Sequence, residues 1–342
     1  MKAIGYLNSL AIDQADALVD FDQAKPSPTG RDLLVKIHAV SVNPVDTKVR
    51  MRVQPENNEH KVLGWDAVGE VVEVGDQVCF YKKGDTVWYA GDLTRPGTNA
   101  EYHLVDERIV GEKPRSLSDA QAAAFPLTAI TAWELLFDRL QIAQTNPTDK
   151  TDQQILVIGA AGGVGSILVQ LATQLTNSLV IGTASRPESQ AWVKELGADH
   201  VIDHRKPLSQ ELKRIGIPSV SHVISLNATE QHFPEIAEVI APQGKFALID
   251  DPSTPLDIGL LKTKSASVHW EFMYTRSMYN TADIEKQREL LNRVATLIDH
   301  GDIKTTFGAH YGTINAANLK RAHADIESGK TIGKIVLEGF DH

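Results

Sequence analysis

The chain has 342 residues, more than one hydrophobic core usually supports, so two domains of ordinary size are expected. Hydrophobic residues make up 42% and charged residues 23%, an ordinary globular composition that excludes a disordered or fibrous chain. The formal net charge of −10 argues against a broad contact with nucleic acid or an anionic membrane, so neither is expected as a partner.

Targeting and redox signals are absent from the sequence. The first residues lack the apolar core of a signal peptide, and no apolar stretch reaches the roughly 18 residues that a membrane helix needs. We therefore expect a cytoplasmic protein. The single cysteine, Cys79, excludes an intrachain disulfide and a four-cysteine zinc lobe.

The first part of the chain, up to about residue 126, is predicted to be mostly strands and turns. Alternating or β-branched runs at 33–42, 68–74 and 86–89 are typical of strands, and glycines at short intervals suit the tight turns between barrel strands.

From residue 154 the pattern changes to apolar strand, turn and amphipathic helix, repeated several times. Strands are predicted at 155–158, 179–183, 200–203, 222–226, 245–249 and from Val268 to Tyr274. Helices are predicted between them at 166–175, 188–196, 208–215 and 230–240. This alternation predicts an α/β domain with a doubly wound parallel sheet.

The tail is predicted to return to the first domain. An amphipathic helix is expected at 283–300, then a short helix at 319–326 and a last strand at 333–337. The expected organisation is a first domain split between 1–127 and 281–342, with 128–280 as the second domain.

A glycine-rich turn follows the first strand of the α/β part and opens its first helix. Gly159, Gly162, Gly163 and Gly165 lie in the stretch GAAGGVG, where glycine allows a sharp turn and the helix N-terminus attracts a pyrophosphate. The sequence thus predicts a dinucleotide site; the alternative is a structural turn. The spacing is GxxGxxG, without the GxG interval of the usual fingerprint.

The end of the second strand indicates which dinucleotide is bound. Proteins specific for NAD place a carboxylate there, whereas this chain has Ser185 and Arg186. A hydroxyl and a guanidinium suit the 2′-phosphate of NADP, so NADPH is the expected cofactor. The alternative for Arg186 is a solvated arginine at a helix start.

Several motifs together resemble the medium-chain dehydrogenase/reductase superfamily, in its quinone oxidoreductase branch. They are SVNPVD at 41–46, LGWDAVGEVV at 63–72, PLTAITAWE at 126–134, the glycine turn at 159–165 and AHADIESGKTIGK at 322–334. The resemblance spans nearly the whole chain. It implies a Rossmann domain, a split GroES-like β-barrel domain and a reaction cleft between them.

Zinc-dependent relatives carry a cysteine at the position of Asn43, a histidine at that of Trp65 and a second cysteine near Pro126. None of these three residues is a zinc donor, and a catalytic zinc needs three protein ligands. We therefore expect no metal, with the indole of Trp65 filling the volume.

The resemblance also implies which residues contact the cofactor. Asn43 and Thr131 would approach the nicotinamide, and Asn227 its ribose. The pyrophosphate would lie against Gly162, Gly163 and Val164, and the 2′-phosphate region would be formed by Ser185, Arg186 and His204. His204 is equally well explained as a surface histidine. Lys330 and Lys334 could neutralise phosphate, but solvated lysines are the favoured interpretation. No catalytic residue is assigned.

The expected function is NADPH-dependent reduction of a quinone or an α,β-unsaturated carbonyl by direct hydride transfer. The alternatives are an NADPH-binding structural or redox-sensing protein and, more distantly, a zinc alcohol dehydrogenase. A homodimer through the edge strand from Val268 to Tyr274 is also expected, unless a helix or loop covers that strand.

Overall fold

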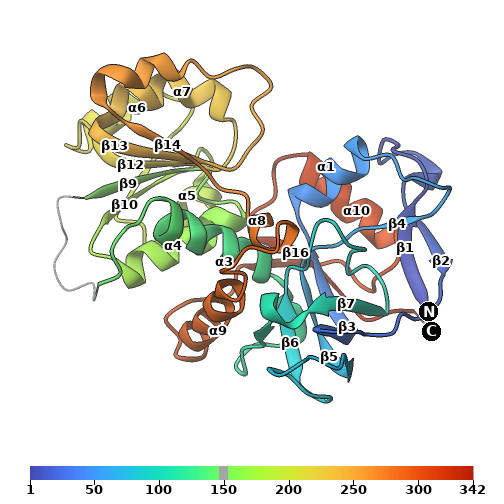
Figure 1. The fold of residues 1–342 in the computed structure, drawn as a ribbon. Helices are drawn as coiled ribbons and strands as arrows, with labels where there is room; N and C mark the ends of the chain where they lie inside the picture. The colour runs from blue at the N-terminus through green and yellow to red at the C-terminus, as the bar shows by residue number, and fades with distance from the viewer. Residues whose placement is uncertain (146–152, 342) are drawn as a thin grey trace. The chain divides into compact units, whose positions relative to one another are not determined.

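The computed structural model describes residues 1–145 and 153–341. The chain divides into two compact units (Figure 1). Unit 1 consists of Met1–Ile130 and Tyr274–His342, and unit 2 of Thr131–Met273. Unit 1 is thus built from both ends of the chain, whereas unit 2 is one continuous segment.

Two sheets form the frame of unit 1. The larger has seven strands in the order β15-β16-β3-β5-β6-β8, with β7 also paired to β3, and the smaller has the order β2-β1-β4. The strands are β1 (Lys2–Tyr6), β2 (Val19–Asp22), β3 (Asp32–Val42), β4 (Lys61–Val62), β5 (Ala67–Val74), β6 (Thr86–Tyr89), β7 (Tyr102–Asp106), β8 (Gly111–Glu112), β15 (Phe307–His310) and β16 (Lys334–Glu338). Since β16 pairs with β3, the end of the chain completes the sheet that its beginning starts.

Unit 1 contains the two helices predicted near the end of the chain, α9 (Lys286–Asp299) and α10 (Ala316–Glu327), and further short helices that were not predicted. The further helices are α1 (Pro44–Arg52), α2 (Asp119–Ala123) and α8 (Thr275–Met278), with single turns at η1 (Ala15–Ala17) and η2 (Glu107–Ile109). Helix α1 starts immediately after β3, because Pro44 fixes the first helical residue and Asp46 accepts a hydrogen bond from the backbone N–H of Asn43 at 2.7 Å.

Unit 2 is a doubly wound α/β domain, as predicted. Its six strands are parallel and follow the order β11-β10-β9-β12-β13-β14. They are β9 (Gln154–Ile158), β10 (Leu179–Thr183), β11 (His200–Ile202), β12 (Val220–Ser225), β13 (Ile240–Leu248) and β14 (Ser267–Trp270). The strand order reverses between β9 and β12, the place where sheets of this kind bind ligands.

The helices of unit 2 lie on both faces of this sheet (Figure 1). They are α4 (Gly163–Leu175), α5 (Pro187–Glu195), α6 (Leu208–Arg214) and α7 (Thr229–Val239), with η3 (Glu134–Arg139) and η4 (Ile258–Lys264), while α3 (Pro126–Trp133) crosses the unit boundary. Buried apolar side chains of α6, α7 and η4 pack against the strands in one continuous core. No helix among the described residues is long and apolar enough to cross a bilayer.

The predicted strand from Val268 to Tyr274 is too long. Among the residues that the structure describes, strand β14 pairs with β13 alone, and the last paired residues are Leu248 and Trp270. Beyond that point the side chain of Glu271 accepts a hydrogen bond from Arg139 at 2.7 Å and is buried. The backbone N–H of Glu271 still donates to the carbonyl of Leu248 at 3.0 Å, and the residues after it turn into α8 instead of continuing the strand.

Candidate functional site: a nucleotide-binding turn and a buried cation

The glycine turn lies directly after β9, at the switch point of the sheet. Gly159 has φ of +83°, a conformation that glycine adopts without strain. Gly162 is the N-cap residue of α4, and no side chain caps that end of the helix. The first N–H groups of a 13-residue helix therefore point out of the turn, an arrangement that suits an anion.

The glycines of this turn differ in how much space a side chain would have at each position. A Cβ at Gly159 would lie 2.5 Å from the side-chain oxygen of Asn227, so the structure brings these two predicted residues together. A Cβ at Gly165 would lie 2.5 Å from the backbone oxygen of Gly159, because α4 packs closely on the end of β9. A Cβ at Gly162 would meet only that same oxygen, at 3.5 Å. The fold thus requires glycine at 159 and 165 but leaves space at 162.

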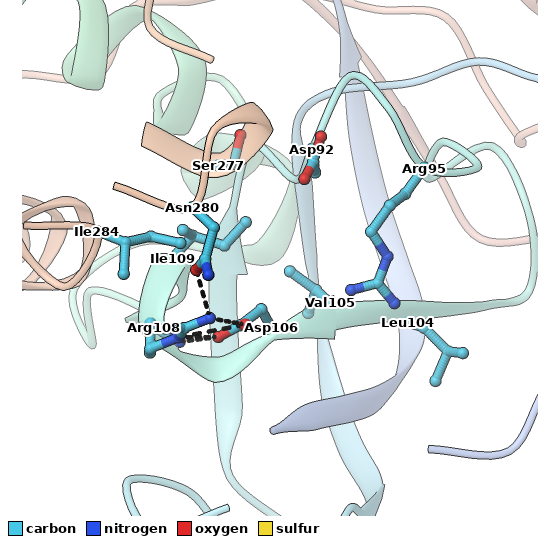
Figure 2. A pocket seen from close by; sticks show the side chains of 10 residues that line it. All are labelled: Asp92, Arg95, Leu104, Val105, Asp106, Arg108, Ile109, Ser277, Asn280 and Ile284. Carbon is cyan, nitrogen blue, oxygen red and sulfur yellow. Dashed lines mark hydrogen bonds and ion pairs between the residues drawn. The ribbon is translucent and has the colours of Figure 1, made fainter. Parts of the chain in front are cut away.

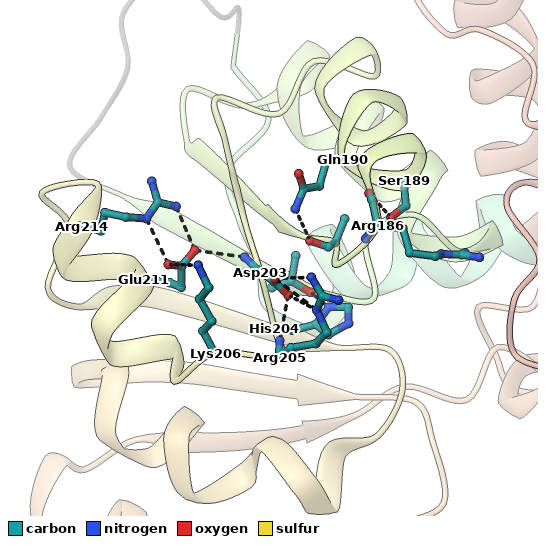
Figure 3. Close-up of polar contacts among 11 residues, drawn as sticks. Arg186, Ser189, Gln190, Asp203, His204, Arg205, Lys206, Glu211 and Arg214 are labelled. Carbon is teal, nitrogen blue, oxygen red and sulfur yellow. Dashed lines mark hydrogen bonds and ion pairs between the residues drawn. The ribbon is translucent and has the colours of Figure 1, made fainter.

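The predicted 2′-phosphate residues lie at the ends of the neighbouring strands β10 and β11. Ser185 is half-buried, while Arg186 is exposed and is the N-cap residue of α5. The Arg186 backbone N–H donates to the Ser189 hydroxyl at 3.2 Å (Figure 3). His204 is half-buried, and its Nδ1 lies 3.2 Å from the hydroxyl of Thr183.

Thr183 is a connection that sequence reasoning missed. Its hydroxyl accepts the backbone N–H of Gly159 at 3.2 Å and also contacts His204. It therefore links the glycine turn to the end of β11. Its place as the last residue of β10, one strand away from the glycine turn, is the only signal that could have indicated this.

Two further basic side chains, of Arg205 and His232, lie near His204 and were not predicted from the sequence. Arg205 pairs with Asp203, with Nη2 2.7 Å from Oδ2, and this hydrogen bonding lowers the pKa of the carboxyl to about 2 (Figure 3). The ring of His232, from α7, lies 6.0 Å from that of His204. Burial is the main cause that lowers the pKa of both histidines. A nearby phosphate would oppose that shift, because it favours the protonated ring.

A second cluster, in unit 1, surrounds the carboxylate of Asp66, which is fully buried. Its Oδ2 accepts hydrogen bonds from Ser41 and Asn43, both at 2.7 Å, and from Lys334 at 3.0 Å. Its Oδ1 accepts the backbone N–H of Leu127 at 2.7 Å. The interpretation of Lys334 as a solvated lysine is therefore wrong, since its side chain reaches inward from β16 to a carboxylate on the other side of β3.

Asp46 lies beside this cluster and is buried as well. Burial raises the pKa of its carboxyl to about 7, and repulsion from Asp66 acts in the same direction. The hydrogen bond from the Asn43 N–H and the charge of Lys334 lower it. The net effect is a pKa of the Asp46 carboxyl raised toward neutral pH.

The residues of this cluster do not fit a zinc ion. Trp65 is buried, its Nε1 donates to the carbonyl of Asp92 at 3.3 Å, and its ring meets that of Tyr274 edge-on at 6.4 Å. Asp46 and Asp66 contribute carboxylates to this cluster, and Asp66 is paired with the ammonium of Lys334. In residues 1–145 and 153–341, no group of three His, Cys, Asp or Glu side chains is placed to hold a metal.

The remaining predicted residue, Thr131, is buried in α3. Asn43 belongs to unit 1 and Thr131 to unit 2. Asn43 lies in the Asp66 cluster, with its amide hydrogen-bonded as above.

A separate cavity of about 170 Å³ in unit 1 contains none of the predicted residues (Figure 2). Its two arginines already have partners. Arg95 forms a two-bonded pair with Asp32 at 2.8 and 3.0 Å, and Arg108 pairs with Asp106 at 2.7 Å and with Asn280 at 3.0 Å. These contacts neutralise the arginines and give no indication of an anion site.

Comparison with known proteins matches both units. Residues 29–115 match the alcohol dehydrogenase GroES-like domain, and residues 196–337 match a zinc-binding dehydrogenase family. A zinc-type alcohol dehydrogenase-like protein of Staphylococcus epidermidis is 37% identical over 337 residues, which cover 98% of this chain and 99% of the relative.

Two crystal structures extend this match. One is a protein of Rhizobium etli CFN 42 named as a candidate zinc-dependent alcohol dehydrogenase; it has a TM-score of 0.96 and 53% identity, over 100% of this chain and 99% of that one. The other is the Escherichia coli quinone oxidoreductase complexed with NADPH, with a TM-score of 0.81 and 26% identity over 99% and 100%. The chain thus belongs to the medium-chain dehydrogenase/reductase superfamily, in its quinone oxidoreductase-like branch.

Proposed function

We propose that the protein is an oxidoreductase that uses NADPH to reduce quinones or α,β-unsaturated carbonyl compounds. The observation that carries the proposal is the open N-terminus of α4 at the switch point of a parallel sheet, directly after Gly159. The similarity to a quinone oxidoreductase complexed with NADPH supports both the cofactor and the acceptor class.

The cofactor would be held by the carboxyl ends of the strands of unit 2. Gly163 and Val164 would donate backbone N–H groups to the pyrophosphate, and Gly162, whose own N–H donates to the carbonyl of Gly159, would let it approach closely. Asn227, beside Gly159, would contact the nicotinamide ribose. Thr131 and, from unit 1, Asn43 would approach the nicotinamide itself.

NADPH is preferred to NADH in this proposal because of the charges around the end of β10. The three residues directly after Thr183, Ala-Ser-Arg at 184–186, include no carboxylate, and Asp203 after β11 is engaged by Arg205. Ser185, Arg186 and His204 would instead meet the 2′-phosphate with a hydroxyl, a guanidinium and an imidazole.

The acceptor class follows from the donor set near Asp66. Bound NADPH supplies a hydride. Simple alcohol oxidation needs a strong Lewis acid to lower the pKa of the hydroxyl, and Asn43, Trp65 and Lys334 form a site that does not suit one. Quinones and enones spread the incoming charge onto oxygen, so they require mainly positioning and modest polarisation.

Steady-state oxidation of NADPH against a panel of quinones, enones and simple aldehydes tests this function. We expect turnover with quinones or enones, weaker use of NADH, and no loss of rate in the presence of a chelator. Tight NADPH binding without turnover of any acceptor would favour a structural or redox-sensing role. Loss of activity on removal of divalent ions, with recovery on adding zinc, would favour a zinc alcohol dehydrogenase.

We further propose a symmetric homodimer through β14. This strand is the last of the sheet in unit 2, and its apolar side chains are exposed, with Val268 at 38% and Trp270 at 58%. Phe272, just beyond the strand, is 47% exposed. An unpaired edge with such side chains favours pairing with a second copy.

A further inference from the structure

We propose that the ammonium of Lys334 is the built-in cation of the Asp66 cluster and acts as a positioning residue. It fixes the amide of Asn43 and takes the place that a metal ion would need. The inference rests on the proposed function for its kinetic consequence, whereas its consequences for folding and metal uptake are independent of it.

The contacts of the ammonium carry the argument. Lys334 is only 3% exposed, and its Nζ donates to Oδ2 of Asp66 at 3.0 Å, to the side-chain oxygen of Asn43 and to the carbonyl of Val42 at 3.3 Å. An ammonium has three N–H donors, so these three acceptors account for all of them. The lysine is coordinated by oxygen atoms much as a small metal cation would be.

The charge balance explains why a cation is needed here. Asp66 is fully buried, and its oxygens accept four hydrogen bonds, including the one from Lys334. A buried carboxylate is costly unless an opposite charge accompanies it. Because Lys334 already supplies that charge, a divalent ion at Asp66 would have to displace an ammonium held by three oxygens.

The ammonium of Lys334 also holds the side chain of Asn43. Its amide nitrogen donates to Asp66, its amide oxygen accepts from Lys334, and its backbone N–H donates to Asp46. A neutral amide between a carboxylate and an ammonium is held in one of its two flipped orientations. Removing the ammonium alone would leave the oxygen end of the amide without its donor, so that only the bond from the amide nitrogen to Asp66 would still hold this side chain.

A double-mutant cycle separates these roles. The variants are Lys334→Met, Asp66→Asn and the double variant, with Lys36→Met as control because Lys36 is an exposed lysine on the adjacent strand β3. The readouts are the urea midpoint, the zinc content after exposure to zinc and desalting, the affinity for NADPH, and kcat and KM for the acceptor.

We expect each single variant to lower the urea midpoint and the double variant to recover most of it, because a neutral pair leaves no unpaired buried charge. We expect kcat to stay roughly 10- to 100-fold low in both Lys334→Met and the double variant, with a smaller change in NADPH affinity, since both variants lack the donor that holds the amide oxygen of Asn43. The wild type should retain only substoichiometric zinc.

Three results would overturn the inference. The first is stoichiometric zinc in the wild type, and the second is a urea midpoint of Lys334→Met equal to that of Lys36→Met. The third is full recovery of kcat in the double variant, which would mean that the lysine only balances the charge of Asp66 and does not position Asn43. If the wild type reduces no acceptor at all, the proposed function fails instead, and the unfolding cycle and the zinc content still decide whether Lys334 is the resident cation.

Discussion

Replacing Gly165 by alanine tests the close contact between α4 and β9 that forms the nucleotide-binding turn. The added methyl would lie 2.5 Å from the backbone oxygen of Gly159 and 2.6 Å from Cα of Ala160, both of which are main-chain atoms that cannot rotate away. The helix must therefore move relative to the strand. Overpacking of this kind costs about 3 kcal/mol at the upper end, and the better helix propensity of alanine returns about 1 kcal/mol.

The expected net loss is thus about 2 kcal/mol, which lowers the melting temperature by about 4–8 °C for a domain of the size of unit 2. The matched control is Gly162→Ala. Its methyl meets only the oxygen of Gly159, at 3.5 Å, so we expect a loss of about 0.5 kcal/mol from the weaker N-cap.

The affinity for NADPH should be reduced more in Gly162→Ala than in Gly165→Ala, the reverse of their effects on stability. In Gly162→Ala the methyl occupies the space through which a pyrophosphate would approach the helix N-terminus, so the folded protein should bind NADPH at least about tenfold more weakly. Thermal unfolding by circular dichroism and a fluorescence titration with NADPH measure the two effects. Equal losses of stability in both variants would refute the assignment of Gly165 to packing and of Gly162 to ligand approach.

Three further predictions concern charge and assembly. Asp46→Asn should remove a pH dependence of stability, because the pKa of Asp46 is raised from 3.8 to about 7 and the native state therefore binds the proton more tightly than the unfolded chain. As the pH rises from 3.8 to about 7, the free energy of unfolding of the wild type should fall by at most about 4 kcal/mol relative to that of the variant. Urea midpoints that change equally with pH in both proteins would contradict this. Arg186→Ala should raise the Kd for NADPH by about 10- to 100-fold and that for NADH much less, as a lost charged hydrogen bond would; equal changes in isothermal titration would assign Arg186 to the surface. Trp270→Asp should convert a dimer to a monomer in size-exclusion chromatography with light scattering, whereas an unchanged elution mass would place any interface elsewhere.

Much of unit 2 could be predicted from the sequence because its signals are local. A strand of apolar residues, a glycine turn and an amphipathic helix each depend on neighbours within a few residues, so β9, the turn and α4 were predicted close to their observed bounds. The signal for the start of α1 at Pro44 is equally local, but the β-branched residues around it also favour a strand, so this helix was not predicted.

Only the tertiary structure decided which distant side chains meet. Lys334 and Asp66 are 268 residues apart, and nothing in the spacing of either indicates that β16 would bring the lysine to a carboxylate beyond β3. The pair of Glu271, just after β14, with Arg139, which lies 132 residues earlier in the chain, likewise has no signal in the sequence. Periodicity reports how one segment buries its own face, whereas the partner of a buried charge is fixed by the arrangement of strands, and that arrangement exists only in the folded chain.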